Sequence, residues 1–220
     1  MMRFYLPSMD GKNNFPPIEE ALREPEGLLA FGGDLEVETL IKAYALGIFP
    51  WFSAKEPILW WSPNPRMVLF PEKFHRSRSF KRAMKKTDYQ VYFDRDFKAV
   101  INACAQTRKN ELGTWITKEM KQAYIKLHKN GQAHCLEIDI DGKLAGGIYG
   151  VALGNIFYGE SMFSLQTNGS KFALFELCQY LIKNNYQILD CQAHSDHLQS
   201  LGAELIPIRE FKKYLPHISV

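Results

Sequence analysis

The chain has 220 residues, 46% of them hydrophobic and 23% charged, with a formal net charge of +3, a composition typical of a globular protein. A chain of this length buries roughly 70% of its unfolded surface, so it needs no disulfide or structural metal, and its composition excludes disorder, collagen and a coiled coil. No run approaches the ~18 apolar residues of a membrane span, and the opening segment MMRFYLPSMDGKNNFPP lacks the apolar stretch of a secretory signal.

The first helix is predicted after a short apolar run, Leu28–Phe31, that ends at two glycines. Asp34 is a suitable N-cap, and Gly47 is a suitable C-terminal stop. The buried face follows the i, i+3, i+4, i+7 spacing and consists of Val37, Leu40, Ile41 and Tyr44.

Aromatic and proline side chains are dense between residues 49 and 65. Proline at this density excludes a helix, so we expect loops around one short extended piece. Trp60 and Trp61 are expected to serve packing. We place a domain boundary near residue 64, which gives a small N-terminal domain, 1–64, and a larger domain, 65–220.

The excess positive charge lies in residues 73–86 (KFHRSRSFKRAMKK), which contain seven Lys or Arg and no acid, while the rest of the chain has 20 basic and 24 acidic side chains. A helix is predicted here, with Phe80, Ala83 and Met84 on its inner face. Like charges at helical spacing on the outer face repel by about a few tenths of a kcal/mol per pair, and a bound polyanion would reverse that effect. We therefore expect a nucleic-acid contact, although a solvated surface helix is the alternative.

The remaining elements begin with two helices, over 96–105 and 117–129, the second capped by Thr117. Tight turns then join three strands, which are expected over 133–140, 143–153 and 156–163. After them come a helix over 171–183, a strand over 187–192, a short helix over 196–201 and a strand over 204–208. This order predicts an α+β fold with a mixed sheet.

Cysteine and histidine give little evidence of a metal. The four cysteines lack CxxC or other metal-like spacing and suit a reducing compartment, which predicts a cytoplasmic protein; they are Cys104, Cys135, Cys178 and Cys191. His194 and His197 have no third ligand in view, so a helix start capped by Ser195 or Asp196 is the better interpretation.

The order of these elements is that of GNAT-type acetyltransferases, whose pyrophosphate loop reads Q/R-x-x-G-x-G/A. Residues 166–170 (QTNGS) match this pattern until its last position, which is Lys171. A small residue there lets backbone amides approach the anion. An acyl-CoA-dependent N-acetyltransferase is therefore one alternative function, and a non-catalytic RNA-binding module is another.

Nine strings occur in one order between about residues 15 and 206: EPEGLLAFGGDL, AYALGIFPWF, PILWWSPNPR, HRSRSFKR, GTWIT, GGIYGV, YGESMFS, LDCQ and HLQSLGA. Together they closely resemble the leucyl/phenylalanyl-tRNA–protein transferase family. The resemblance implies a small N-terminal domain and a GNAT-like domain with a mixed, largely antiparallel sheet. It also implies transfer of Leu or Phe, less well Met, from Leu-tRNA or Phe-tRNA to proteins with N-terminal Arg or Lys, which marks them for degradation. No metal or other cofactor is implied, and we expect a monomer.

Asp190 and Gln192 are the candidate catalytic pair. They lie at i and i+2 on a predicted strand, so both side chains should face the same side. Asp190 would attract the incoming ammonium or take up its proton, while Gln192 aligns it; the proton could instead leave through the ribose hydroxyl of the tRNA. A buried Asp satisfied by backbone amides is the alternative.

The other candidate residues concern the substrates. Glu160 would bind the 3′-terminal adenosine or the basic N-terminal residue, and Trp51 and Trp115 would stack on the adenine. Tyr44 and Tyr124 would line the same site, unless they belong to the core. The resemblance assigns the pocket for the transferred amino acid to Ile148, Phe157, Leu177 and Leu189. The acceptor-stem phosphates would be bound by Arg76, Arg78, Lys81, Arg82 and Lys85.

Overall fold

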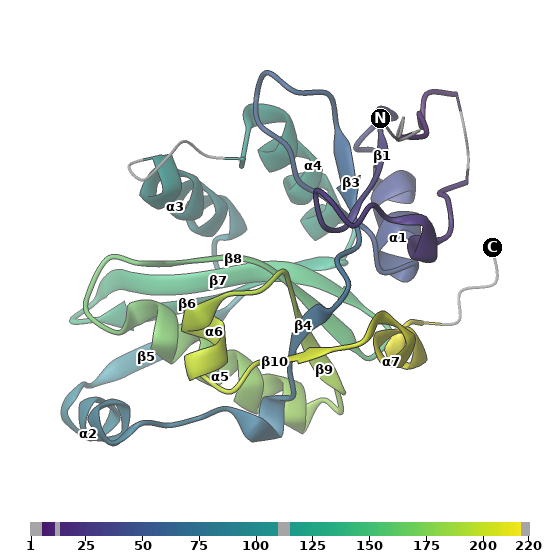
Figure 1. Ribbon diagram of the computed structural model, residues 1–220. Helices are drawn as coiled ribbons and strands as arrows, with labels where there is room; N and C mark the ends of the chain where they lie inside the picture. Colours follow the sequence, from purple (N-terminus) through teal and green to yellow (C-terminus); the bar gives the residue numbers. More distant parts are fainter. Residues whose placement is uncertain (1–5, 12–13, 110–114, 217–220) are drawn as a thin grey trace.

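The computed structural model describes residues 6–11, 14–109 and 115–216 (Figure 1). Its main feature is a seven-stranded sheet in the order β10-β4-β9-β8-β7-β6-β5. The strands are β4 (Arg66–Leu69), β5 (Tyr89–Phe93), β6 (Ala133–Ile140), β7 (Lys143–Leu153), β8 (Ile156–Ser164), β9 (Ile188–Gln192) and β10 (Glu204–Ile206). Only β8 and β9 pair in parallel. The predicted α+β fold, with a mixed and largely antiparallel sheet, is confirmed.

A second, three-stranded sheet lies near the N-terminus, in the order β1-β3-β2. Its strands are β1 (Leu28–Phe31), β2 (Phe49–Pro50) and β3 (Leu59–Trp61). The aromatic segment thus contributes two short strands rather than one, and its Pro50 lies on an edge strand, where a missing N–H costs no ladder bond. Helix α1 (Val37–Ala45) has Glu36, not Asp34, at its N-cap position. The Asp34 carboxylate lies before the helix and accepts from the Glu36 N–H and the Thr39 hydroxyl.

Helices cover both faces of the large sheet (Figure 1). Helices α3 (Phe97–Lys109), α4 (Lys118–Lys129) and α1 lie over one face, and α5 (Gly169–Lys183) and α2 (Arg78–Lys86) lie over the other. Trp60 of β3 and Tyr124 of α4 share one buried cluster, so the N-terminal elements pack on the large sheet. The domain boundary near residue 64 stays a prediction.

The basic helix α2 forms as its pattern predicts. Ser77 caps it through a hydrogen bond from the Phe80 N–H. Phe80 is buried, with its ring centroid 5.4 Å from that of Phe172 on α5, while Arg78 and Lys81 are exposed. The apolar side of the segment therefore holds it on α5 and leaves its charges in solvent.

The sequence failed to predict two strands, β4 and β5. All four residues of β4 are buried, so the strand has no polar face and none of the alternation that identifies a strand. Beyond β10, the chain turns into the short helix α7 (Ile208–Phe211), although the strand was expected to continue to residue 208. The other short elements are α6 (Asp196–Ser200) and single 3₁₀ turns at Ile18–Glu20, Pro71–Lys73 and Lys212–Tyr214.

Candidate active site

A cleft of about 670 Å³ opens where β8 and β9 separate. The two strands pair from Ile156 and Ile188 to Tyr158 and Asp190, and then diverge. The cleft contains the later residues of both strands, one end of α5, and side chains of the N-terminal elements. It thus joins segments far apart in the sequence, including Pro63, Trp115, Gly159, Ser170 and His194.

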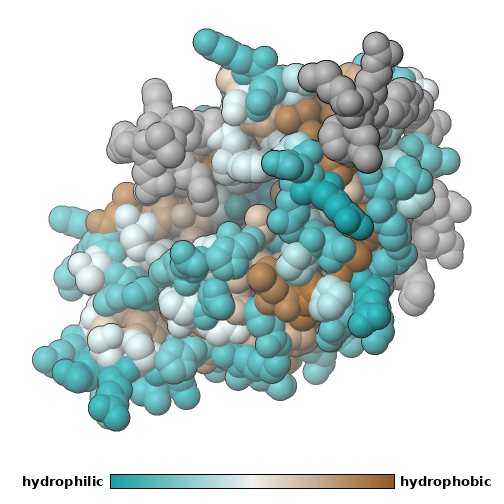
Figure 2. Space-filling model, viewed as in Figure 1, coloured by the Kyte–Doolittle hydropathy of each residue, from teal (hydrophilic) through white to brown (hydrophobic). Residues whose placement is uncertain are grey.

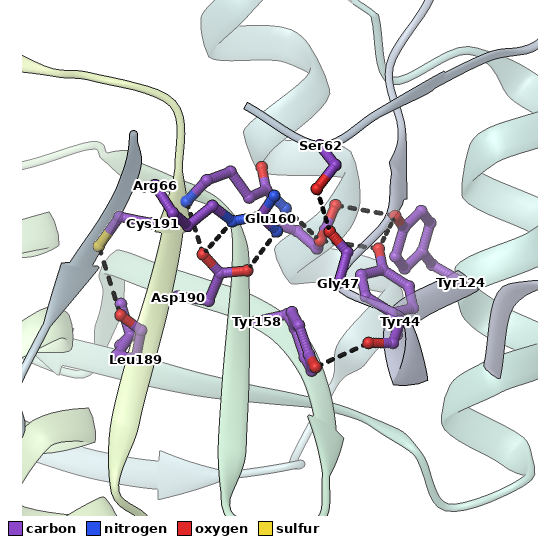
Figure 3. Close-up of polar contacts among 11 residues, drawn as sticks. Tyr44, Gly47, Ser62, Arg66, Tyr124, Tyr158, Glu160, Leu189, Asp190 and Cys191 are labelled. Atoms are coloured by element: carbon purple, nitrogen blue, oxygen red, sulfur yellow. Dashed lines mark hydrogen bonds and ion pairs between the residues drawn. The ribbon is translucent and has the colours of Figure 1, made fainter. Parts of the chain in front are cut away.

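Glu160 is the titratable group at the base of this cleft. It lines the cleft with only 6% of its surface exposed. Its carboxylate accepts 2.8 Å hydrogen bonds from the hydroxyls of Tyr44 and Tyr124 and from Nε2 of Gln192. Figure 3 shows the two tyrosines converging on Glu160. Burial raises the pKa of Glu160 to about 7, although these three hydrogen bonds lower it in part. A carboxyl group with this pKa can exchange a proton near neutral pH.

Asp190 lies behind Glu160 and does not line the cleft. Asp190 and Arg66 are both 0% exposed, and Nε and Nη2 of Arg66 donate to the two carboxylate oxygens at 2.8 and 2.6 Å (Figure 3). The expectation that Asp190 meets the incoming amine directly is therefore corrected. Its carboxylate is already occupied by a guanidinium from β4, a strand that the sequence did not predict.

Gln192 connects the buried ion pair to the cleft. Its backbone N–H donates to Oδ1 of Asp190 at 2.9 Å, and its φ is +66°, in the left-handed region. Its side-chain amide donates to Glu160 and lines the cleft. Of the predicted catalytic pair, Gln192 lines the cleft, and Asp190 contacts the backbone of Gln192 without lining the cleft.

Comparison with known proteins identifies the family. The sequence model described as "Leucyl/phenylalanyl-tRNA protein transferase" matches residues 68–216, and its N-terminal counterpart matches residues 33–64. Relatives of that name are 53% identical to this chain in Pseudomonas fluorescens (strain Pf0-1), over 91% of this chain and 89% of theirs, and in Nitrosomonas europaea, over 93% and 87%. The chain belongs to the leucyl/phenylalanyl-tRNA protein transferase family. The predicted resemblance and the prediction of an aminoacyltransferase are both confirmed.

Solved structures share the fold at much lower identity. FemX is 13% identical, with a TM-score of 0.51 over 77% of this chain and 66% of its own. An aminoglycoside acetyltransferase from an uncultured soil metagenomic sample is 12% identical, with a TM-score of 0.40 over 63% and 94%. The chain therefore shares its fold with FemX.

Aromatic side chains line part of the cleft. Trp51 and Trp115 both line it, and Trp51 is 48% exposed. Trp61 packs against the core, as expected, and its ring lies 5.3 Å from that of Trp51; in addition it lines the cleft. Tyr44 and Tyr124 are fully buried beneath Glu160, and the expectation that they line the cleft is corrected. Their inward helical positions were the sequence signal for burial.

Half of the predicted amino-acid pocket lines the cleft. Ile148 and Leu189 are among its lining residues, whereas Phe157 and Leu177 are buried in the core outside it, which corrects their assignment. The sequence reasoning missed further apolar lining residues from β8 and α5, namely Met162, Phe163 and Leu174. Met162 and Phe163 belong to the string YGESMFS, which was the available signal.

The basic helix lies one helix away from the cleft. Its Phe80 packs on Phe172 and Phe175 of α5, the helix whose Ser170 and Leu174 line the cleft. Arg76, outside α2, lies with its guanidinium 5.7 Å from the Phe175 ring. Hydrophilic side chains gather at the lower left of Figure 2, where Figure 1 places α2. Helix α5 therefore packs against α2, which carries the exposed charges, and also contributes residues to the cleft.

Ser195 caps α6 by accepting a hydrogen bond from the Leu198 N–H, which confirms the helix start predicted between His194 and His197. His194 and His197 both line the cleft. Within residues 6–11, 14–109 and 115–216, no group of three or more His, Cys, Asp or Glu side chains is placed to hold a metal ion. In the same residues no helix is long and apolar enough to cross a bilayer.

Proposed function

We propose that this protein transfers leucine or phenylalanine, less well methionine, from aminoacyl-tRNA to the N-terminus of proteins that begin with Arg or Lys, and so marks them for degradation. The observation that carries the proposal is Glu160, a carboxyl group with a pKa of about 7 in a cleft with aromatic and apolar walls. Family membership supplies the substrate classes. We further propose that the enzyme works as a monomer in the cytoplasm.

The reaction needs orientation and one proton transfer. The aminoacyl group is an activated ester, so the enzyme supplies no chemical energy, and orientation alone lowers a barrier by several kcal/mol. The neutral α-amine of the acceptor attacks the ester carbonyl, the amide bond forms, and the bond from the carbonyl to the ribose oxygen breaks. The amine loses one proton, and the departing ribose oxygen gains one.

We assign the transfer of that proton to Glu160. When ionised, it can take the proton from the acceptor amine and pass it to the ribose oxygen, since its pKa lies close to those of α-amino groups. Gln192 holds one oxygen of Glu160 and positions it toward the cleft. Asp190 is a positioning residue in this scheme, because it fixes the backbone of Gln192.

The aminoacyl-tRNA and the acceptor protein would contact different parts of the cleft and of the surface near it. Trp51 and Trp115 offer ring faces to the terminal adenine, where stacking contributes ~1–3 kcal/mol, and Ile148 and Leu189 lie where an unbranched-β side chain would be bound. The stem phosphates would contact the basic residues of the predicted set, which are Arg76, Arg78, Lys81, Arg82 and Lys85. The Arg or Lys side chain of the acceptor is positively charged, and the described residues of the cleft include the carboxylates of Glu26 and Glu160 but no Lys or Arg.

One assay separates this function from its alternatives. The protein is incubated with labelled Leu-tRNA and a peptide beginning with Arg, with an Ala-initiated peptide as the control. We expect label in the Arg peptide without added coenzyme A. Acetyl-CoA turnover without transfer would instead support an N-acetyltransferase, and tRNA binding without chemistry would support an RNA-binding module.

A further inference from the structure

Arg66, like its partner Asp190, is a fully buried charged side chain near the cleft. Its guanidinium is 0% exposed and lies between two aromatic rings, 4.9 Å from the centroid of Phe49 and 4.7 Å from that of Phe211. Phe49 belongs to β2 and Phe211 to α7, so segments from both ends of the chain hold this cation. Together with Asp190, they fix its plane and its position.

The buried ion pair of Arg66 and Asp190 is not explained by its contribution to stability. Nη1 of Arg66 is buried without a hydrogen-bond partner among the described residues, and an unmet buried donor destabilises a fold. A buried ion pair is often no more stabilising than apolar residues of similar volume. A role in the reaction explains why a guanidinium occupies this place.

The contacts of Arg66 lead to the cleft in three steps. Arg66 binds both oxygens of Asp190, and Oδ1 of Asp190 accepts from the backbone N–H of Gln192. Gln192 has a left-handed φ that a non-glycine residue rarely adopts. Its side-chain amide then donates to Glu160. Each step is a hydrogen bond of 2.6–2.9 Å between groups with little freedom to move.

We propose that Arg66 is a positioning residue for the transfer reaction: by orienting Asp190, it holds Gln192 in its left-handed conformation and keeps the Gln192 amide on Glu160. The inference rests on the proposed function. A carboxyl group that exchanges a proton must be placed accurately, and a misplacement of about 1 Å costs on the order of 100-fold in rate. A lysine at this position would keep the charge but could not bind two oxygens in parallel.

The test compares Arg66→Lys and Arg66→Ala with Arg95→Met. Arg95 is a matched control because its guanidinium also binds carboxylates, those of Glu137 and Asp139, yet it does not line the cleft. Transfer is measured with Leu-tRNA and an Arg-initiated peptide at a temperature where circular dichroism shows each variant folded. We expect kcat to fall by about 100-fold in both Arg66 variants, with KM for Leu-tRNA unchanged, and to stay near wild type in Arg95→Met.

Chemical rescue distinguishes positioning from general support. Arg66→Ala leaves a space between two aromatic rings that matches ethylguanidinium in shape. Added below denaturing concentrations, this ion should raise the kcat of Arg66→Ala at least tenfold. Ethylammonium should leave that kcat unchanged. Rescue by both cations, by neither, or equal losses in Arg95→Met would overturn the proposal.

A structural measurement keeps the inference separate from the proposed function. In a crystal structure of folded Arg66→Ala, we expect Gln192 to have left Glu160, even if the wild-type protein proves inactive with Leu-tRNA. If the 2.8 Å bond between Gln192 Nε2 and Glu160 persists, Arg66 does not position Gln192. Inactivity of the wild type would refute the proposed function alone.

Discussion

Replacing Glu160 with Gln should stabilise the protein at alkaline pH while slowing the transfer reaction. The carboxyl has a pKa of about 7 in the folded protein, against 4.5 for an ordinary Glu. Because the folded-state pKa is raised, the associated stability is fully present below pH 4.5 and is lost as the pH rises through 7. A difference of about 2.5 pH units, at 1.36 kcal/mol each, corresponds to a loss of about 3 kcal/mol.

The assay is urea unfolding of the wild type and of Glu160→Gln at pH 5 and pH 8. Other groups titrate equally in both proteins, so the difference between them isolates Glu160. From pH 5 to pH 8, we expect the wild type to lose about 2.5 kcal/mol more of its unfolding free energy than the variant. The same pH dependence in both proteins would refute the raised pKa and, with it, the assignment of Glu160 as proton acceptor.

Three further predictions concern the two substrates. The double variant Arg78→Glu, Lys81→Glu should weaken tRNA binding and reduce its salt dependence by about one unit of slope per lost phosphate contact; filter binding at several salt concentrations checks this, and an unchanged slope would remove α2 from the interface. Trp51→Ala should raise KM for Leu-tRNA by the equivalent of ~1–3 kcal/mol with little change in melting temperature, since the ring is half exposed, and an unchanged KM would refute stacking. Ile148→Ala should change the ratio of Leu to Phe transfer, whereas Leu177→Ala should cost about 2–5 kcal/mol of stability and leave that ratio as it is; the opposite outcome would place Leu177 in the pocket.

Helices with one apolar face and strands joined by tight turns could be predicted, because neighbouring residues in the sequence determine both patterns. The helix α2 follows from Phe80 on one face and Arg78 and Lys81 on the other, and the antiparallel strands β6, β7 and β8 follow from their tight turns. Strand β4 could not be predicted, because a four-residue strand buried on both faces has no periodicity. Because β4 was not predicted, the position of Arg66 next to Asp190 could not be predicted either.

The candidate site depends on contacts that no local pattern shows. Family strings identified Glu160, Asp190 and Gln192, and all three are joined in one hydrogen-bonded network. Their surroundings differ in ways that only three-dimensional packing determines. Arg66 binds Asp190 across 124 positions of sequence, and it occupies the buried Asp190 carboxylate, whereas Glu160 lines the cleft.

The central claim is that the ionised carboxylate of Glu160 accepts the proton of the acceptor amine, and a pH–rate profile tests it most directly. Single-turnover transfer of labelled leucine to an Arg-initiated peptide is measured from pH 5 to pH 9 for the wild type and for Glu160→Gln, with the same peptide in both series. The wild-type rate should rise with pH through about 7, and the variant should be slower by about 10²–10⁴-fold and lack that rise. A variant that retains the wild-type rate and the same rise near pH 7 would contradict the claim.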